Sequence, residues 1–313
     1  MHRKAMKMPS GILLWAEVSS SEGLQFNDII GDITDDINRY AVPVTMTPER
    51  LIFFSHSIKH QTNFSPKNMT DLHLPEHCSA LGDNKKFCFS CHPDVPCFNE
   101  CCHQLDLILT PYDVLRLKTR LKRHSGIFLE QFVIIEWEEG MLFPACYLTM
   151  VDDGKASCVF VKDYGCRIYE DRPAACRAYP VGRGVSSQED GSITEQLVLL
   201  REPHCRGFET DKKFSSVEYF KDQGLEEYNR YNDKMLQLLH HPKIQAGFRP
   251  TKEQADQYIM ALYNLDTFRQ ELTNGYIQMN TPLSVMEQLA MQNDDKVLLL
   301  IATRWLIQEY FGE

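Results

Sequence analysis

Long hydrophobic runs are missing from this sequence. The longest candidate, Val297 to Ala302, has six residues, whereas a membrane-spanning helix needs about 18 consecutive apolar residues. The first residues (HRKAMK, then GILLWA) faintly imitate a signal peptide, but the apolar run is short, Glu17 interrupts it, and no small-x-small cleavage site follows cleanly. These features predict a cytoplasmic protein without a membrane partner.

An excess of positive charge is also missing. The 313 residues include 33 basic and 43 acidic side chains, and the net charge is −10. Because nucleic-acid binding draws on a basic surface, we predict no nucleic-acid partner. One local basic stretch runs from Arg116 to His124 (RLKTRLKRH), and this pattern is more typical of a solvated helix face.

The sequence lacks the usual signature of a nucleotide-binding turn. Gly182-Arg183-Gly184 is followed by VSSQEDG, which does not begin a helix as a Gly-rich strand-to-helix turn would require. The C-x3-C-x2-C arrangement expected of radical enzymes that use S-adenosylmethionine is missing too. These absences argue against a methyltransferase with a Gly-rich nucleotide-binding turn and against a radical enzyme that uses S-adenosylmethionine.

Cysteine, by contrast, is abundant. The chain has eleven cysteines, and five of them fall between Phe87 and Cys102, in FCFSCHPDVPCFNECC. An odd number leaves at least one thiol outside any complete set of disulfides, and disulfide-dense scaffolds are typically far shorter than this chain. Closely packed thiols in a reducing compartment are usually metal ligands. The sequence therefore predicts a metal site, and soft thiolate sulfur selects Zn(II), Cu(I) or an iron–sulfur cluster.

The spacing of these cysteines fits an ordinary zinc ribbon poorly. A structural zinc site usually has two C-x2-C pairs, but here only Cys88 and Cys91 form such a pair. On a helix, Cys97 and Cys101 would share one face and Cys102 would point about 100° away. The vicinal pair can therefore serve one metal only in a turn, or it can serve two adjacent metals. A site built from two distant blocks fits better, and the second block consists of Cys158, Cys166 and Cys176.

Three segments of the sequence carry a family resemblance: CHPDVPCFNECC, LTPYDVLRLK and CVFVKDYGCRIYEDRPAACRAYP. Together they resemble the YkgJ-type cysteine-cluster family, also described as a zinc- or iron-chelating domain, over about residues 85 to 210. The resemblance implies metal or iron–sulfur binding, and some members of the family are associated with flagellin lysine N-methylation. The family's second signature is matched here by Cys166, Ile168, Tyr169, Arg172, Pro173, Cys176, Arg177 and Pro180.

The first block departs from the family's short form. Five residues separate Cys91 from Cys97, and three separate Cys97 from Cys101. The choice between Cys88 and Cys91 as a ligand therefore stays open. We favour Cys91, because Cys-His-Pro-x-Val-Pro-Cys is similar to the form found in one subgroup of the family.

Eight thiols make up the expected ligand set, which would suit two four-sulfur sites or one larger cluster. Its members are Cys91, Cys97, Cys101, Cys102, Cys158, Cys166, Cys176 and Cys205. Nearby guanidinium groups would compensate the negative charge and donate hydrogen bonds to sulfur; these belong to Arg172, Arg177 and Arg201. Alternatively, Arg172 and Arg177 form surface ion pairs with Glu170 and Asp171.

The remaining candidates have weaker support. Cys78 and Cys146 are expected to be small buried hydrophobic residues. Three histidines adjoin an expected ligand and could replace one, since imidazole suits zinc and iron; they are His92, His103 and His204. A nucleophilic pair of Cys102 and His103 is less favoured, because a catalytic thiol rarely needs seven companions.

The order of elements predicts an α+β fold, with a small cysteine-rich metal-binding core and a mainly helical C-terminal region. We expect an irregular N-terminal extension with short helices (1–84), the cysteine-cluster domain (85–210) and the helical region (211–313). Strands are predicted at 104–109, 132–137, 143–150, 157–162 and 193–200. Helices are predicted at 31–40 and 48–54, from the Thr110 cap, from capping boxes at Ser215 and Thr251, along the apolar stripes 228–238 and 255–272, and at 284–310.

Three functions remain open. The first is a metalloprotein that holds an iron–sulfur cluster or Fe/Zn ions, with a possible protein partner. The second is a flagellin-type protein lysine N-methyltransferase that uses S-adenosylmethionine. The third is a structural zinc protein that acts as an interaction module. Whether the chain is an enzyme stays undecided.

Overall fold

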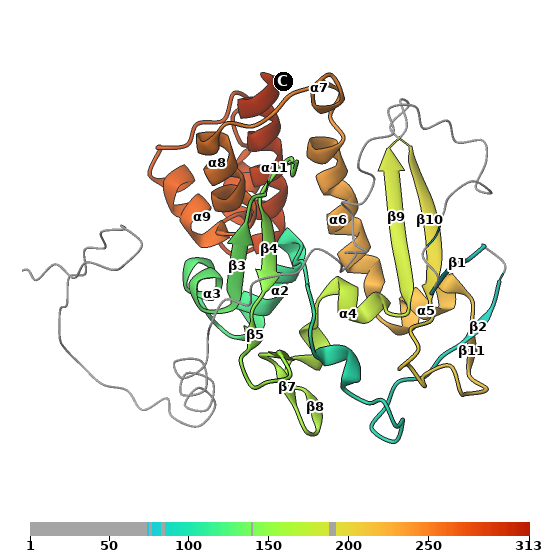
Figure 1. Cartoon of the computed structure of the whole chain (residues 1–313). Helices are drawn as coiled ribbons and strands as arrows, with labels where there is room; N and C mark the ends of the chain where they lie inside the picture. Colours follow the sequence, from blue (N-terminus) through green and yellow to red (C-terminus); the bar gives the residue numbers. More distant parts are fainter. Residues whose placement is uncertain (1–73, 75–76, 83–84, 139, 188–191) are drawn as a thin grey trace, which may run out of the picture. The chain divides into compact units, whose positions relative to one another are not determined.

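The computed structural model describes residue 74 and residues 77–82, 85–138, 140–187 and 192–313 (Figure 1). The chain divides into two compact units, Met1–Arg39 and Tyr40–Glu313, and every described residue belongs to the second. The helices expected at 31–40 and 48–54 lie outside the described residues. Within them, the fold is α+β with a helical C-terminal region, as predicted.

The largest sheet has three antiparallel strands in the order β1 (Cys78–Ala80), β10 (Ile193–Leu200) and β9 (Val181–Ser187). β10 has the bounds expected from its alternating pattern, and its Leu197 and Leu199 are buried in a core with Val181. Gly182 and Gly184 lie within β9 and not in a strand-to-helix turn. This placement agrees with the absence of a nucleotide-binding signature.

The other strands form short antiparallel pairs. These are β2 (Phe87–Cys88) with β11 (Lys213–Phe214), β3 (Val133–Glu136) with β4 (Ala145–Leu148), β5 (Met150–Val151) with β6 (Ser157–Cys158), and β7 (Val161–Lys162) with β8 (Gly165–Cys166). The single strand predicted at 157–162 is therefore two strands in different pairs. The segment 104–109 forms no full strand, but it runs alongside β4: the Leu109 amide donates a hydrogen bond to Cys146 O (2.7 Å).

The helix predicted from Thr110 is α2 (Pro111–Arg120). Thr110 accepts a hydrogen bond from the Asp113 amide and Asp113 bonds back to the Thr110 amide, so the helix begins with a full capping box. Four short helical segments of the cysteine-containing part were not predicted: α3 (Ser125–Phe132), α4 (Ala174–Ala178) and the 3-10 turns at Glu100–Cys102 and Tyr169–Asp171.

The C-terminal region consists of α5 (Ser216–Asp222), α6 (Leu225–Leu239), α7 (Pro242–Gln245), α8 (Lys252–Leu262), α9 (Leu265–Thr273), α10 (Val285–Ala290) and α11 (Asp295–Phe311). The capping boxes at Ser215 and Thr251 begin α5 and α8, as predicted. The stripe 255–272 is split between α8 and α9, and the stretch 284–310 is split between α10 and α11. Each split occurs where an Asn or Asp takes a non-helical backbone: Asn264 and Asp294.

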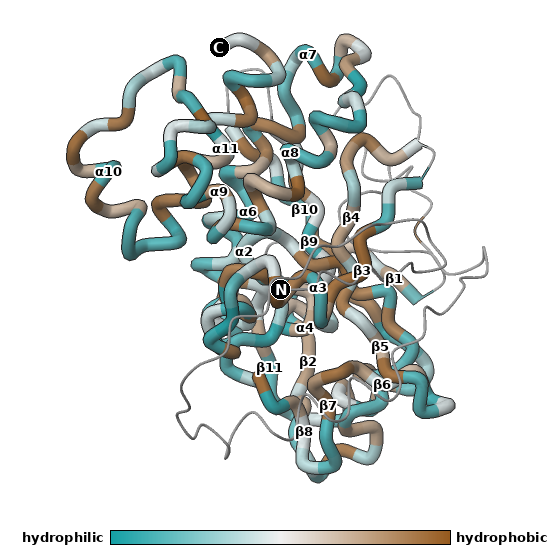
Figure 2. Tube along the Cα trace, turned by 90° about the vertical axis from the view of Figure 1, so that its left-hand side faces the viewer, coloured by the Kyte–Doolittle hydropathy of each residue, from teal (hydrophilic) through white to brown (hydrophobic). Residues whose placement is uncertain are grey.

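These helices pack directly against the cysteine-containing part of the chain. α6 contacts α2, α4, α11 and β9, and it lies between α11 on one side and β9 on the other (Figure 1). α8, α9 and α11 gather at one end of this unit, and the β7–β8 hairpin lies at the opposite end (Figure 2). The helical region therefore supports the scaffold that carries the thiols.

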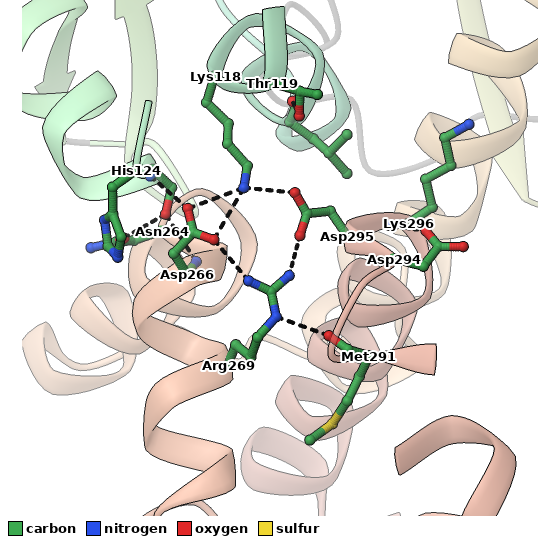
Figure 3. A network of polar contacts seen from close by, with 12 residues as sticks. Lys118, Thr119, His124, Asn264, Asp266, Arg269, Met291, Asp294, Asp295 and Lys296 are labelled. Carbon is green, nitrogen blue, oxygen red and sulfur yellow. Dashed lines mark hydrogen bonds and ion pairs between the residues drawn. The ribbon is translucent and has the colours of Figure 1, made fainter. Parts of the chain in front are cut away.

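A closed ring of four charges joins α2 to α9 and α11 (Figure 3). Lys118 Nζ lies 3.0 Å from an Asp266 oxygen and 2.6 Å from an Asp295 oxygen, and Arg269 bonds to both carboxylates. We call these four residues the charge ring. Lys118 is only 7% exposed, so the expectation that Arg116 to His124 forms a solvated helix face is wrong at this position.

Candidate metal centre

Main-chain hydrogen bonds hold the first cysteine block against the segment that contains Cys205. The Ser90 amide donates to Gly207 O (2.8 Å), and the Arg206 amide donates to Cys97 Sγ (3.1 Å). Residues more than a hundred positions apart therefore lie side by side here. This contact places Cys97 next to the loop that carries Cys205.

Cys91 belongs to the same neighbourhood. The pKa of its thiol is raised to about 11, first by burial and then by the nearby thiols of Cys101, Cys97 and Cys205, while the Arg172 charge opposes the rise. Thiolates raise one another's pKa only when they are near neighbours, so these thiols belong to one part of the molecule. Cys91, Cys97 and Cys205 form what we call the first thiol group.

The second thiol group consists of Cys158, Cys166 and Cys176, which come from β6, β8 and α4. Burial and then the Cys166 and Cys101 thiols raise the pKa of Cys158 to about 12. The pKa of Cys176 is also raised, by burial and by the thiols of Cys158, Cys166 and Cys101. Two strands and one helix thus bring together thiols that are separated in sequence.

Cys101 links the two groups. Its thiol acts on the pKa of cysteines in both: Cys91, Cys158, Cys166, Cys176 and Cys205. The pKa of Cys101 itself is raised, mainly by a hydrogen bond with the adjacent Cys102 and then by burial. Cys101, on the 3-10 turn Glu100–Cys102, therefore lies near both thiol groups.

Backbone N–H groups point at several of these sulfurs. Three thiols accept a hydrogen bond from the amide two residues further along the chain: Cys158 from Phe160, Cys166 from Ile168 and Cys205 from Gly207. Each of these bonds lowers the pKa of its thiol, because an N–H donor favours the thiolate over the thiol. Thiolates, and not thiols, bind metals, so the local backbone suits metal ligation.

Three of the cysteines are exposed to solvent although protein surrounds their side chains. Cys91, Cys101 and Cys176 are exposed, yet burial contributes to the raised pKa of all three thiols. Each of these three residues therefore has protein on some sides and solvent on another.

The donor set fits a thiophilic metal, but the sulfurs do not yet converge on one point. Among the described residues, no three His, Cys, Asp or Glu side chains are arranged to hold an ion. The raised thiol pKa values have a clear electrostatic meaning, since packed thiolates repel one another unless a cation compensates them.

Asp113 connects the two halves of the cysteine domain, a role that we did not predict. One of its oxygens caps α2 through Thr110, and the other accepts a hydrogen bond from the Ala174 amide (2.8 Å) at the start of α4. Burial raises the pKa of this carboxyl, whereas the amide bonds lower it. Because α4 carries Cys176, Asp113 fixes the second thiol group relative to α2. In the sequence, the only sign of this role was the presence of an Asp in the capping box, because one of its two carboxylate oxygens is not needed for capping.

Arg172 lies close enough to the thiols to compensate their charge. Its guanidinium opposes the rise in pKa of both Cys91 and Cys166. The same group donates to Tyr169 O (2.7 Å) and to Gln223 Oε1 (2.7 Å), so it is fixed in place. Arg172 thus bridges the first and second thiol groups electrostatically.

Arg177 has a different role, because its hydrogen bonds go to main-chain oxygens. It donates to Arg172 O (3.0 Å) and Gln223 O (2.8 Å) and stacks over the Tyr228 ring. Asp171 instead pairs with Arg116. Both Arg172 and Arg177 are buried, so the alternative of surface ion pairs is wrong.

The cysteines and histidines outside the expected set have other surroundings. Cys146 is fully buried in β4, as expected, and Cys78 is partly buried in β1. Each histidine has a partner of its own: His92 Nδ1 lies 3.5 Å from Asp94, His103 Nδ1 lies 2.9 Å from Ser157 Oγ, and His204 Nε2 lies 3.7 Å from Glu202. Cys88 pairs with Lys213 across β2 and β11.

The close approach of Gly207 to Phe89 and Ser90 leads to a first prediction. A Cβ at position 207 would lie 2.6 Å from the Phe89 ring and 3.0 Å from Ser90 O. Gly207→Ala should therefore push the Cys205 loop away from the first cysteine block and lower the free energy of unfolding by about 1–3 kcal/mol. Urea denaturation of the two proteins measures this difference.

The matched control is Gly184→Ala in β9. A Cβ there meets nothing nearer than Gln196 O at 3.8 Å, which is an ordinary contact. This variant should keep the wild-type unfolding free energy to within about 0.5 kcal/mol. Equal stability of all three proteins would contradict the close packing of Gly207.

A cavity lies elsewhere in the described structure. It has a volume of about 310 Å³ and is lined by α2, α9 and the start of α11, including Lys118, Asp266, Arg269 and Asp295 (Figure 3). Four of its charged side chains are already paired within the charge ring, Lys296 pairs with Glu227, and Asp294 caps α11. The cavity is therefore a polar cleft with balanced charge. Among the described residues, no helix has the length and hydrophobicity needed to cross a membrane.

Comparison with known families identifies the cysteine-rich segment. Residues 90–206 match the CxxCxxCC family, described as "Putative zinc- or iron-chelating domain". This match confirms the resemblance noted in the sequence and supports metal binding by this part of the chain. No curated protein and no solved structure matches the chain.

Proposed function

We propose that the chain is a metal-binding protein whose eight thiolates, drawn from two sequence blocks and Cys205, hold an iron–sulfur cluster or Fe/Zn ions. The position of Cys101 near both thiol groups supports this proposal most directly. A thiol that interacts with both groups makes a single shared centre, or two adjacent ones, geometrically reasonable.

The number and grouping of the thiols favour two sites of four sulfurs or one larger cluster. Each thiol group has three members, and the vicinal Cys101 and Cys102 could complete one group each. Four thiolates are the usual complement of a structural zinc ion and of a small iron–sulfur cluster. Arg172 would offset part of the resulting negative charge. Its position fits that role, whereas Arg177 fits a structural one.

The proposal keeps the division of the chain at 84 and 210, with the helical region as support for the metal centre. Three contacts illustrate how this support acts. Arg116 on α2 bonds to Asp171, just before the second thiol group's Cys176, and also to Glu227 on α6. Lys296 on α11 reaches the same Glu227 (2.6 Å). α2 is thus fixed between the metal centre and the C-terminal helices.

Metal analysis of anaerobically purified protein tests the proposal. A brown protein with visible absorbance, iron and acid-labile sulfide would support the iron–sulfur form. A colourless protein with stoichiometric zinc would instead favour the structural zinc form. Protein that contains neither metal, and that takes up neither after anaerobic reconstitution, would contradict the proposed function as a whole.

No contact in the described residues favours the methyltransferase alternative over metal binding alone. Binding of S-adenosylmethionine by the full chain, measured by calorimetry, would be the result that revives it.

A further inference from the structure

The hydroxyl of Tyr179 is a buried polar group without a hydrogen-bond partner of normal geometry among the described residues. Burying a hydroxyl in this way is costly, and such groups are rarely left unpaired without a reason. Tyr179 follows Cys176 by three residues, at the end of α4. The unpaired hydroxyl therefore lies in the chain segment that forms the second thiol group.

The phenol ring cannot easily turn to find another partner. Tyr179 packs edge-on against Phe89, with the ring centroids 6.0 Å apart and an interplanar angle of 70°. Its backbone is fixed at both ends, because its amide donates to Ala175 O (3.2 Å) and its carbonyl accepts from the Tyr219 hydroxyl. The direction of the hydroxyl is thus set by the fold.

Cys205 lies in the same neighbourhood. Tyr179 and Cys205 pack against the same buried cluster around Phe89. The Tyr179 hydroxyl is a neighbour of the Cys205 thiol there. Glu202 also lies near this hydroxyl, but its side chain is 41% exposed and pairs with His204, so solvent and His204 can satisfy it.

We propose that Tyr179 is a positioning residue of the metal centre, whose hydroxyl donates a hydrogen bond to the Cys205 thiolate once that sulfur binds a metal. The inference rests on the proposed function. A thiolate is a better acceptor than a thiol, so metal loading supplies the partner that the hydroxyl lacks. The bond would also join the second thiol group, through α4, to a ligand of the first.

Substitution Tyr179→Phe tests this role, because it removes the hydroxyl and keeps the ring. Co(II) is the probe, since its thiolate complexes absorb in the near ultraviolet through sulfur-to-metal charge transfer. Loss of the hydrogen bond should weaken Co(II) affinity about 10-fold in competition with a chelator. It should also move the charge-transfer band to longer wavelength, because a thiolate without that donor gives up its electrons more easily.

Tyr228→Phe is the matched control. The Tyr228 hydroxyl is likewise buried without a partner of normal geometry among the described residues. Its neighbour, however, is the Arg177 guanidinium and not a thiol, and its ring packs against Tyr112. This variant should keep the wild-type affinity and band position. A purely structural effect of losing a buried hydroxyl would instead change both variants alike, and that result would overturn the inference.

The two proposals can fail separately. If Tyr179→Phe binds Co(II) with wild-type affinity and an unshifted band, the inference about Tyr179 is wrong and the metal centre stands. If the wild-type chain binds neither Co(II) nor its native metal, the proposed function is wrong and the inference falls with it.

Discussion

Replacement of Cys176 by serine should remove most of the bound metal. Cys176 is the thiol through which α4 contributes to the second thiol group, and it interacts with Cys158, Cys166 and Cys101. A serine hydroxyl is a hard donor that stays protonated near neutral pH, so it cannot replace a soft thiolate. Because metal binding and folding are coupled, stability should fall as well. We expect metal content below about half of the wild-type value, and Cys101→Ser should behave in the same way.

Cysteines outside the two thiol groups provide the controls. Cys146→Ala changes a fully buried thiol in β4 and should cost stability but leave metal content normal.

The variants Cys88→Ala and Cys91→Ala decide which of these two cysteines of the first block is a ligand. The contacts of Cys91 with Cys97, Cys101 and Cys205 favour it as the ligand. Normal metal content in both Cys176→Ser and Cys101→Ser would contradict the ligand set.

Helix starts were predictable because their chemistry is local. Thr110, Ser215 and Thr251 each accept a hydrogen bond from the amide three residues ahead, and all three begin helices in the structure. The break between α8 and α9 was not predictable in this way. Asn264 there bonds through its side chain to Ser125 (2.8 Å), 139 residues earlier. A long-range contact therefore overrides the apolar stripe that suggested one continuous helix.

The metal centre shows the same division between local and distant chemistry. Cysteine spacing predicted that two blocks contribute ligands, since neither contains a complete set with ordinary spacing. It could not show what holds the blocks together. The bond from Asp113 to the Ala174 amide, the close approach of Gly207 to Phe89, and the direction of the Tyr179 hydroxyl all depend on the folded chain.

The charge ring carries the second large prediction. Substitution Lys118→Met should lower the free energy of unfolding by about 3–5 kcal/mol, because it leaves two buried carboxylates with one cation. Asp266 and Asp295 are only 15% and 19% exposed as side chains, so water cannot replace the lost partner well. Lys296→Met is the matched control. Lys296 pairs with Glu227 at 2.6 Å but is 36% exposed, and its loss should cost at most about 1 kcal/mol.

Acid denaturation distinguishes loss of the charge from loss of packing in Lys118→Met. Burial raises the pKa of Asp266, but the Ser125 amide, Lys118 and Arg269 together lower it to about 2. A carboxyl whose pKa is lowered in the folded state stabilises the protein above its unfolded pKa of about 3.9, and this contribution is lost as the pH falls toward 2. Without Lys118 the pKa of Asp266 should rise, so the difference in unfolding free energy between variant and wild type should shrink as the pH falls from 7 to 3. A difference that stays constant over that range would mean that Lys118 acts through packing, because a lost ion pair must depend on the charge of its partner.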